Sequence, residues 1–244
     1  MIKFFRQIRQ NLVTENKISK YLLYAIGEIL LVVIGIMIAL SIKNWNEEQN
    51  LKTQEIKILK ELLVNLEADS ADHAANAVWY INSSSAARII VNTLEARSAW
   101  NDSMAVHYGW LYLKGQANLN TSAYDNLKAI GFSIISNDSI RIGLTHLHSS
   151  YYDRLLKFEK EIAQDHGTYI VMPVLVKRLR MDKWFHATPL DYETLLDDLE
   201  FREVVRFRGI SMDQMKIYCI DARDATSNLM QMIRRELVIR EESD

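Results

Sequence analysis

The side chains that usually carry catalysis or bind metals are few in this chain of 244 residues. It has a single cysteine, and its histidines are His73, His107, His146, His148, His166 and His186. His146 and His148 stand two residues apart in a stretch with helical spacing, where such residues point to different faces. They are therefore poorly placed to share one metal ion, and no HExxH or CxxC motif is present. We expect no metal site and no bound cofactor.

The patterns of nucleophilic and phosphate chemistry are also missing. Asp165 and His166 have the types of two triad members, but adjacent helical residues do not face each other and no G-x-S-x-G elbow is present. Cys219 lies in a helical pattern that is typical of a small buried hydrophobe. Glycine-rich phosphate loops are absent. We therefore expect that the protein is not an enzyme.

Charge gives little indication of a polyanionic partner. There are 29 basic and 31 acidic residues, so no overall field favours nucleic acid. The basic residues near the C-terminus are interleaved with acidic ones, as on helix faces joined by ion pairs, and a phosphate or lipid site is the alternative. The arginines concerned are Arg202, Arg206, Arg208, Arg223, Arg234, Arg235 and Arg240.

One ionisable residue, Glu28, lies inside an apolar run over residues 21–42. At about 1.5 Å of rise per residue, this run can cross the roughly 30 Å hydrocarbon core of a bilayer. Tyr21 and Trp45 flank it as interface anchors. The alternative is a cleaved signal peptide, but the run is longer than the usual apolar region of such peptides. The sequence therefore predicts a transmembrane helix over residues 21–42.

Lysine and arginine are enriched before this helix, which predicts that the N-terminus is cytoplasmic and that the residues beyond about 43 lie outside the cytoplasm. Residues 1–20 form a basic amphipathic cytoplasmic segment. It either lies along the inner leaflet or serves as a basic tail that sets the orientation.

The Glu28 side of the helix also carries Tyr24, Gly35 and Ala39. A carboxylate at membrane depth usually faces a partner or water. Gly35 and Ala39 make a small-xxx-small pattern, which lets a second helix approach closely. We expect a helix contact on this side. The alternatives are a protonated or snorkelling glutamate with a structural role, and a path for ions or protons.

The rest of the chain has helical spacing and few glycines or prolines, which predicts an all-α fold. We expect the membrane helix to continue as a stalk helix over residues 43–68, followed by an antiparallel helical bundle in an exterior domain over 69–244. Acidic residues at 69–72 leave open whether a new helix starts there. Pro173 predicts a break or kink, and a last helix is expected from Ser211 or Asp213 to about Ile239.

The polar segment between the long helices is the best candidate for an interaction surface. Thr121 or Ser122 is expected to cap a helix that ends at a left-handed Gly131. Tyr124, Asp125 and Lys128 lie on that helix. The alternative is that these residues only build a helical hairpin.

Several motifs occur together with these features. YAIGEI (24–29), VIGI (33–36) and NWNE (44–47) follow one another, the chain opens with MIKFFRQIRQNL, and residues 121–128 read TSAYDNLK. This set resembles an uncharacterised family of single-span membrane proteins in Bacteroidota. The resemblance implies an inner-membrane protein with its bulk in the periplasm, and it implies no activity.

We therefore expect a membrane-anchored periplasmic helical protein that acts in protein–protein interaction or assembly. Its expected partners are the lipid bilayer and either a second copy or another membrane protein. One rival is a subunit of an ion- or proton-coupled complex that uses Glu28. The other is a periplasmic enzyme or ligand sensor with a pocket between outer helices.

Overall fold

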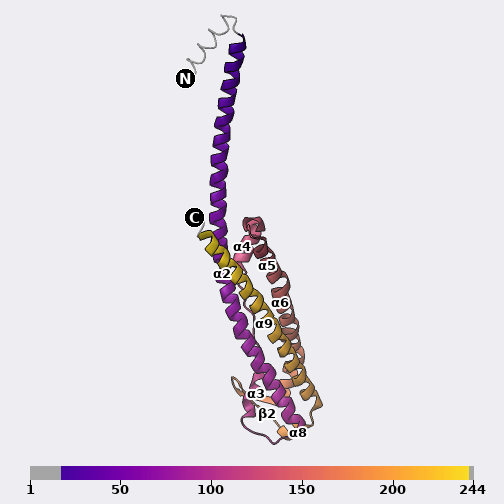
Figure 1. Cartoon of the computed structure of the whole chain (residues 1–244). Coiled ribbons are helices and arrows are strands. Elements are labelled where there is room, and N and C mark those ends of the chain that lie inside the picture. The colour runs from indigo at the N-terminus through magenta and orange to yellow at the C-terminus, as the bar shows by residue number, and fades with distance from the viewer. Residues whose placement is uncertain (1–17, 242–244) are drawn as a thin grey trace. The chain divides into compact units, whose positions relative to one another are not determined.

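The computed structural model describes residues 18–241 (Figure 1). The predicted cytoplasmic segment over residues 1–20 lies outside the described residues except for its last three. About 82% of the chain is helical, which confirms the predicted helical class. By contacts the chain divides into two units, residues 1–54 and 55–244, and the long helix α2 (Ile18–Glu95) contributes to both.

In the first unit, α2 carries a stretch that is long and apolar enough to cross a membrane. The large apolar side chains of residues 22–42 have exposed fractions from 44% at Val33 to 76% at Leu23. None of them is buried against the rest of the described chain. This surface is unsuited to water, because such a long apolar run is normally covered by lipid or protein.

The second unit, residues 55–244, holds all the other elements. The helices after α2 are α3 (Met104–Trp110), α4 (Ser122–Ile130), the 3₁₀ turn η1 (Phe132–Ile134), α5 (Asp138–His146), the π-helix η2 (Leu147–Tyr152), α6 (Asp153–Phe158), the π-helix η3 (Glu159–Val171), α7 (Met172–Arg178), α8 (Tyr192–Leu196) and α9 (Leu199–Glu241). Two short strands, β1 (Leu179–Lys183) and β2 (His186–Pro189), lie between α7 and α8.

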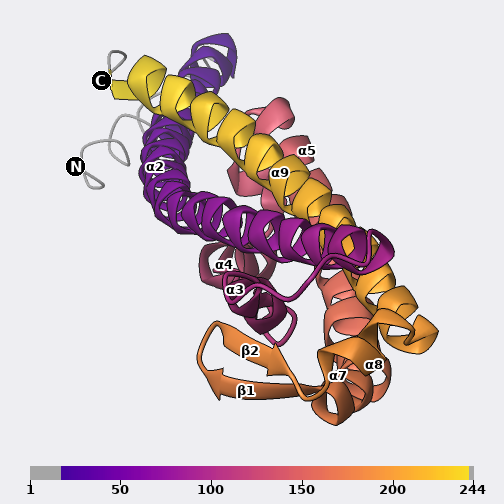
Figure 2. The same ribbon diagram turned by 90° about the horizontal axis from the view of Figure 1, so that it is seen from below.

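Helix α9 runs along the part of α2 that belongs to this unit, in the opposite direction (Figures 1 and 2). The contacts between the two helices show the direction, because residues with higher numbers on α2 contact residues with lower numbers on α9. Glu67 pairs with Arg234 at 2.7 Å, Arg88 with Asp213 at 3.1 Å, and Glu95 with Arg206 at 2.5 Å. These residues are half-exposed, so each pair contributes at most about 1 kcal/mol.

The two helices approach closely at Gly209 of α9. A Cβ atom at this position would lie 3.0 Å from the Cβ of Ala87 and 3.8 Å from the carbonyl oxygen of Ser84, both on α2. The small side chains on both helices therefore allow the backbones to come together.

A single helical path from α5 to α7 packs against α9. Asn137 caps its start, since Asn137 Oδ1 accepts hydrogen bonds from the amides of Ser139 at 3.0 Å and Ile140 at 3.3 Å. The predicted break at Pro173 does not occur. This proline lies at the junction where the π-helix η3 changes into the α-helix α7. The helical path continues to Arg178.

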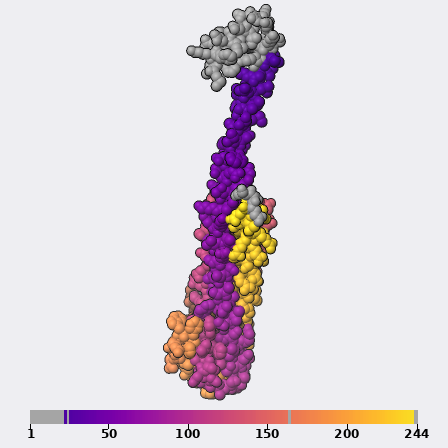
Figure 3. All heavy atoms as spheres, turned by 60° about the vertical axis from the view of Figure 1, so that its left-hand side comes forward, coloured from indigo at the N-terminus to yellow at the C-terminus, as the bar shows by residue number. Residues whose placement is uncertain are grey.

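The hairpin of β1 and β2 was not predicted, and it is the exception to the all-α expectation. The strands pair antiparallel, with Leu179 opposite Pro189 and Met181 opposite Ala187. Phe185 turns the chain with φ of +63°. The hairpin packs beside α3, and it forms a projection, orange in Figure 3, on the surface of this unit.

The last helix begins at Leu199, earlier than the predicted start at Ser211 or Asp213. Helix α2 passes through residues 69–72 without a new start, which answers the question that the sequence left open. Helix α4 lies between Thr121 and Gly131, as predicted, but Thr121 makes no side-chain capping bond, and Gly131 has a positive φ of 108° with an extended ψ of 136°. The compact unit itself begins at Glu55, ahead of the predicted domain start at residue 69.

The core of this unit has two apolar clusters. One cluster gathers residues 58–80 of α2, residues 123–155 and α9 from Met212 onward. The other joins residues 87–94 of α2 with α3, α7, the hairpin, α8 and the start of α9. Between them along the two long helices lie Ser83, Ser84, Arg208 and Ser211, all buried. A polar layer therefore separates the two apolar parts of the core.

Candidate functional site

The predicted membrane contact residues lie on α2. Glu28, Gly35 and Ala39 are exposed, and a Cβ atom built at Gly35 would meet no other described atom within 4 Å. The interface anchor Trp45 is 63% exposed. The side chains of Tyr21 and Tyr24 lie outside the described part of the chain. At Gly35 the described part of the chain therefore leaves room for a second helix.

The predicted interaction surface on α4 is partly used inside the chain. Tyr124 is half-buried and its ring stacks on His148, with 3.6 Å between centroids and 7° between planes. Phe132 packs against the same tyrosine at 5.7 Å. Asp125 and Lys128 are exposed and lie 3.8 Å apart. The contacts of Tyr124 fix the position of α4, so Asp125 and Lys128 are the residues of this set that a partner could reach.

A buried stripe on α2 holds polar residues that sequence analysis did not single out. Its members recur at alternating spacings of four and three, the heptad pattern of a helix that packs along its length. They are Glu55, Leu59, Leu62, Leu66, Asp69, His73, Asn76, Tyr80, Ser83, Ala87, Ile90 and Leu94, and every one of them is buried. This spacing is visible in the sequence. A polar residue at a position that continues the apolar spacing was therefore the signal that the residue is buried.

Asp69 is the centre of the first polar group. Its carboxylate accepts hydrogen bonds from the backbone amide of Asn120 at 2.7 Å and from the hydroxyl of Tyr152 at 3.0 Å. The Tyr152 oxygen also lies 3.1 Å from the hydroxyl of Thr226 on α9. Burial raises the pKa of Asp69, and the bonds to Asn120 and Tyr152 oppose that rise. This chain of contacts ties α2, η2 and α9 together through the core.

His73 lies beside this group and is fully buried. Its ring packs edge-on against Tyr152 at 5.3 Å, and neither ring nitrogen has a hydrogen-bond partner among the described atoms. Burial lowers the pKa of His73 to about 4, while the charge of Asp72 acts in the opposite direction. The imidazole is therefore neutral at neutral pH.

The next polar residues hold the connection that follows α3. Asp72 accepts a hydrogen bond from the amide of Asn118 at 3.0 Å, and Asn76 accepts one from the amide of Gln116 at 3.2 Å. Glu159 of η3 accepts from the amide of Ala117 at 3.1 Å. Three side chains thus satisfy successive backbone amides of a connection that has no regular structure. Their arrangement is that of a structural support.

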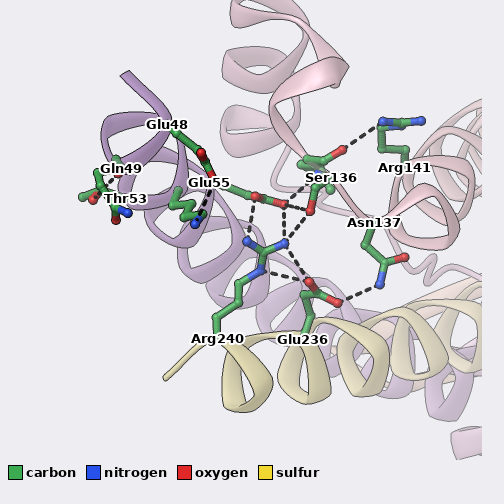
Figure 4. A network of polar contacts seen from close by, with 11 residues as sticks. Glu48, Gln49, Thr53, Glu55, Ser136, Asn137, Arg141, Glu236 and Arg240 are labelled. Carbon is green, nitrogen blue, oxygen red and sulfur yellow. Dashed lines mark hydrogen bonds and ion pairs between the residues drawn. The ribbon is translucent and has the colours of Figure 1, made fainter. Parts of the chain in front are cut away.

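The last polar group lies where the unit begins (Figure 4). Glu55 is 3% exposed and pairs with Arg240 of α9 at 2.9 Å. It also accepts a hydrogen bond from the amide of Ser136 at 2.7 Å. Arg240 pairs with Glu236 at 2.7 Å, and Glu236 accepts from the side chain of Asn137 at 2.7 Å. This network joins the start of the unit, the cap of α5 and the end of α9.

Groups of three or more histidine, cysteine, aspartate or glutamate side chains that could hold a metal ion do not occur within residues 18–241. Cys219 is buried, as expected of a small hydrophobe, and burial raises the pKa of its thiol to about 12. The thiol is therefore protonated at neutral pH and a poor nucleophile.

Comparisons with protein-family models, with curated proteins and with solved structures gave no match.

Proposed function

We propose that this chain is a single-span inner-membrane protein with a periplasmic helical domain, which acts by associating with a second copy or with another membrane protein. The observation that carries the proposal is the exposed apolar surface of residues 22–42, since a bilayer is the environment in which it is stable. The excess of cations before residue 21 supports a cytoplasmic N-terminus.

The anchor face supports association within the membrane. Gly35 and Ala39 leave the backbone of α2 accessible, and van der Waals packing between close backbones is a main driving force for helix association in lipid. Glu28 lies on the same face and can strengthen such a contact with an interhelical hydrogen bond of about 1 kcal/mol.

The buried carboxylates of the second unit support a non-catalytic role. Glu55, Asp69 and Glu159 accept hydrogen bonds from backbone amides of connecting segments, so their acceptor capacity is used in holding the fold. We infer that the helices of residues 55–244 form an antiparallel bundle, in agreement with the opposed directions of α2 and α9. A rigid domain of this kind is suited to presenting a surface to a partner.

Topology is tested with reporters fused after Asp244 of the full chain. A reporter that is active only in the periplasm is expected to work, whereas one that needs the cytoplasm is expected to fail. The mature protein is expected to retain the residues that precede the apolar run. A mature N-terminus near residue 41 would show that the apolar run is a signal peptide and would refute the anchor.

Association is tested by cross-linking of single cysteines placed along residues 24–42, in a Cys219→Ala background. Cross-links with helical periodicity at positions 28, 35 and 39 would identify a contact between copies, and a Gly35→Leu substitution should abolish them because it separates the backbones. If cross-links between copies are absent, co-purification of the detergent-solubilised protein with another membrane protein is expected. A chain that remains alone in both experiments contradicts the proposal.

Glu28 separates this proposal from ion coupling. Glu28→Gln keeps the size and hydrogen-bonding capacity of the side chain but removes its titratable group. Association should therefore survive this substitution and weaken modestly with Glu28→Leu. Loss of biological function with Glu28→Gln, while association remains intact, would favour the ion-coupled alternative.

A further inference from the structure

Arg208 of α9 is the most deeply buried arginine among the described residues, with 5% of its surface exposed. One guanidinium nitrogen donates to the backbone carbonyl of Leu113. Its Nε has no hydrogen-bond partner among the described atoms, and no ion pair joins it to a described carboxylate. Within the described part of the chain, this buried positive charge thus has a single hydrogen bond, to a neutral carbonyl group.

The other arginines of this unit show how unusual this is. Arg206, one half-turn earlier on α9, is 40% exposed and pairs with both Glu95 and Glu203. Arg240 and Arg178 each contact two carboxylates. A buried cation without a counter-charge costs several kcal/mol, much more than an exposed one. Arg208 is thus the arginine that most needs a counter-charge, and it has none among the described residues.

Burial lowers the pKa of Arg208 to about 10, and the nearby Tyr80 acts in the opposite direction. The side chain therefore remains charged at neutral pH. The Tyr80 hydroxyl is itself buried without a partner among the described atoms. Deprotonation does not relieve the cost of the buried charge under physiological conditions.

Arg208 lines a cleft of about 360 Å³ between the end of α3, the junction of η3 with α7, and α9. Lys114 contributes a second cation to the lining, and Glu159 attracts it from a distance. Leu111, Val171 and Met172 form apolar walls. Two cations thus lie at the surface of a cleft whose remaining walls suit a small apolar group.

We propose that this cleft binds a small organic anion, with its oxyanion headgroup on Arg208 and Lys114 and its apolar body against Leu111, Val171 and Met172. A guanidinium group suits this task, because its fork of donors matches a carboxylate or a phosphate. This site is independent of the association proposed for the membrane helix, and its test does not depend on the state of assembly.

The experiment measures the melting temperature of the detergent-solubilised full chain with inorganic phosphate, acetate and benzoate as probes. Benzamide is the neutral control for benzoate, and ionic strength is held constant with choline chloride. At least one anion is expected to raise the melting temperature in a saturable way, whereas benzamide should not. Comparison of phosphate with the two carboxylates shows which headgroup the cleft prefers. Comparison of benzoate with acetate shows whether the apolar walls contribute to binding.

Substitutions assign the effect to the cleft. Arg208→Met should lower the apparent affinity for the anion by about 10- to 100-fold. It should also raise the melting temperature of the anion-free protein, because it removes an unpaired buried charge. Lys114→Met should weaken binding without abolishing it. Arg206→Met, on the same helix but outside the cleft, should leave the response unchanged.

Two results would overturn the proposal. One is the absence of saturable stabilisation by all three anions. The other is a response to anions that Arg208→Met leaves intact. Destabilisation of the anion-free protein by Arg208→Met would likewise count against the proposal, because it would show that the interaction with the carbonyl of Leu113 is the reason for the burial of this arginine.

Discussion

Glu55 and Arg240 form an ion pair across 2.9 Å that joins the first residue of the compact unit to the last turn of its last helix. The glutamate is almost fully buried, and the side chain of Arg240 is 17% exposed. Glu55 also accepts a hydrogen bond from the amide of Ser136. Removal of Arg240 would therefore leave the buried carboxylate without its counter-charge but still with a hydrogen bond.

Arg240→Met is therefore expected to destabilise the protein by about 3 kcal/mol, the cost of leaving one member of a buried pair without its counter-charge. Glu55→Gln combined with Arg240→Met should recover part of this loss, since the neutral amide still accepts from the Ser136 amide. Chemical denaturation followed by circular dichroism measures both effects.

The neighbouring pair Lys60–Glu241 is a matched control, because it joins the same two helices at 3.1 Å but is more than half-exposed on both sides. Glu241→Ala should change the unfolding free energy by no more than about 1 kcal/mol. Equal losses for Arg240→Met and Glu241→Ala would show that burial does not set the strength of these two pairs.

His73 makes stability depend on pH. Its pKa is about 4 in the folded chain and about 6.5 when unfolded, so the unfolded chain binds the proton more tightly. Above pH 6.5 the imidazole is neutral in both states and has no effect. As the pH falls from about 6.5 to about 4, stability should decrease, by roughly 3 kcal/mol from this residue alone.

His73→Leu should flatten the unfolding free energy across this range of pH, measured by denaturation at several pH values. Burial also lowers the pKa of His148 to about 4, so some dependence should remain. The raised pKa of Asp69 acts in the opposite direction near the acidic end. His146→Gln is the control for substitution of an exposed histidine, and it should change the unfolding free energy at neutral pH by no more than about 0.5 kcal/mol.

Gly109 of α3 permits the hairpin to dock. A Cβ atom at this position would lie 2.1 Å from the carbonyl carbon of Phe185 and 2.5 Å from the amide nitrogen of His186. Backbone atoms cannot move as a side-chain end can, so Gly109→Ala should displace the hairpin and cost about 1–3 kcal/mol. It should also separate Phe185 from Trp79 and Trp110, which it now contacts at 5.7 and 5.1 Å.

Limited trypsin digestion reports this displacement, because Arg180 and Lys183 lie in β1. Cleavage there should be faster in the Gly109→Ala protein. Gly143→Ala is the control, since its new methyl would meet only the flexible end of Leu229, at 3.0 Å. This second substitution should leave digestion of the hairpin unchanged. Equal digestion of the Gly109→Ala protein and the unsubstituted chain would show that the hairpin tolerates a side chain there.

Tyr152→Phe removes the hydroxyl that joins Asp69 to Thr226 and leaves the ring in place. The expected loss is about 1–3 kcal/mol, because buried acceptors lose their donor. Tyr151→Phe, at the adjacent and less buried tyrosine, should have little effect on thermal unfolding. A similar decrease in melting temperature for both variants would show that the hydrogen bond from Tyr152 to Asp69 does not contribute measurably to stability.

Apolar spacing predicted most of the helices, because a helix that is buried on one side needs an apolar residue at every third or fourth position of the sequence. The hairpin escaped this reasoning. Its turn uses Phe185 at positive φ in place of an Asn-Gly or Asp-Gly pair, and the conformation is supported by Trp79 and Trp110, which are far away in sequence.

The polar residues of the core could also be predicted only in part. The heptad spacing of Glu55, Asp69 and His73 could have been read from the sequence, but their partners come from loops and helices that no local pattern specifies. Arg208 looked like every other arginine among interleaved charges. Its lack of a counter-charge depends on which face of α9 is buried at that turn, and only the folded chain shows this.

The opposed directions of α2 and α9 have a mechanical consequence. The first residue of the unit, Glu55, lies beside the last turn of α9, as its contact with Arg240 shows. A force that pulls these two chain ends apart therefore meets the cross-helix contacts one after another, with Glu55–Arg240 first, then Glu67–Arg234, then Arg88–Asp213. Forced unfolding is governed by the rate of barrier crossing. The buried pair at the open end of the two helices is therefore the first contact that such a force has to break.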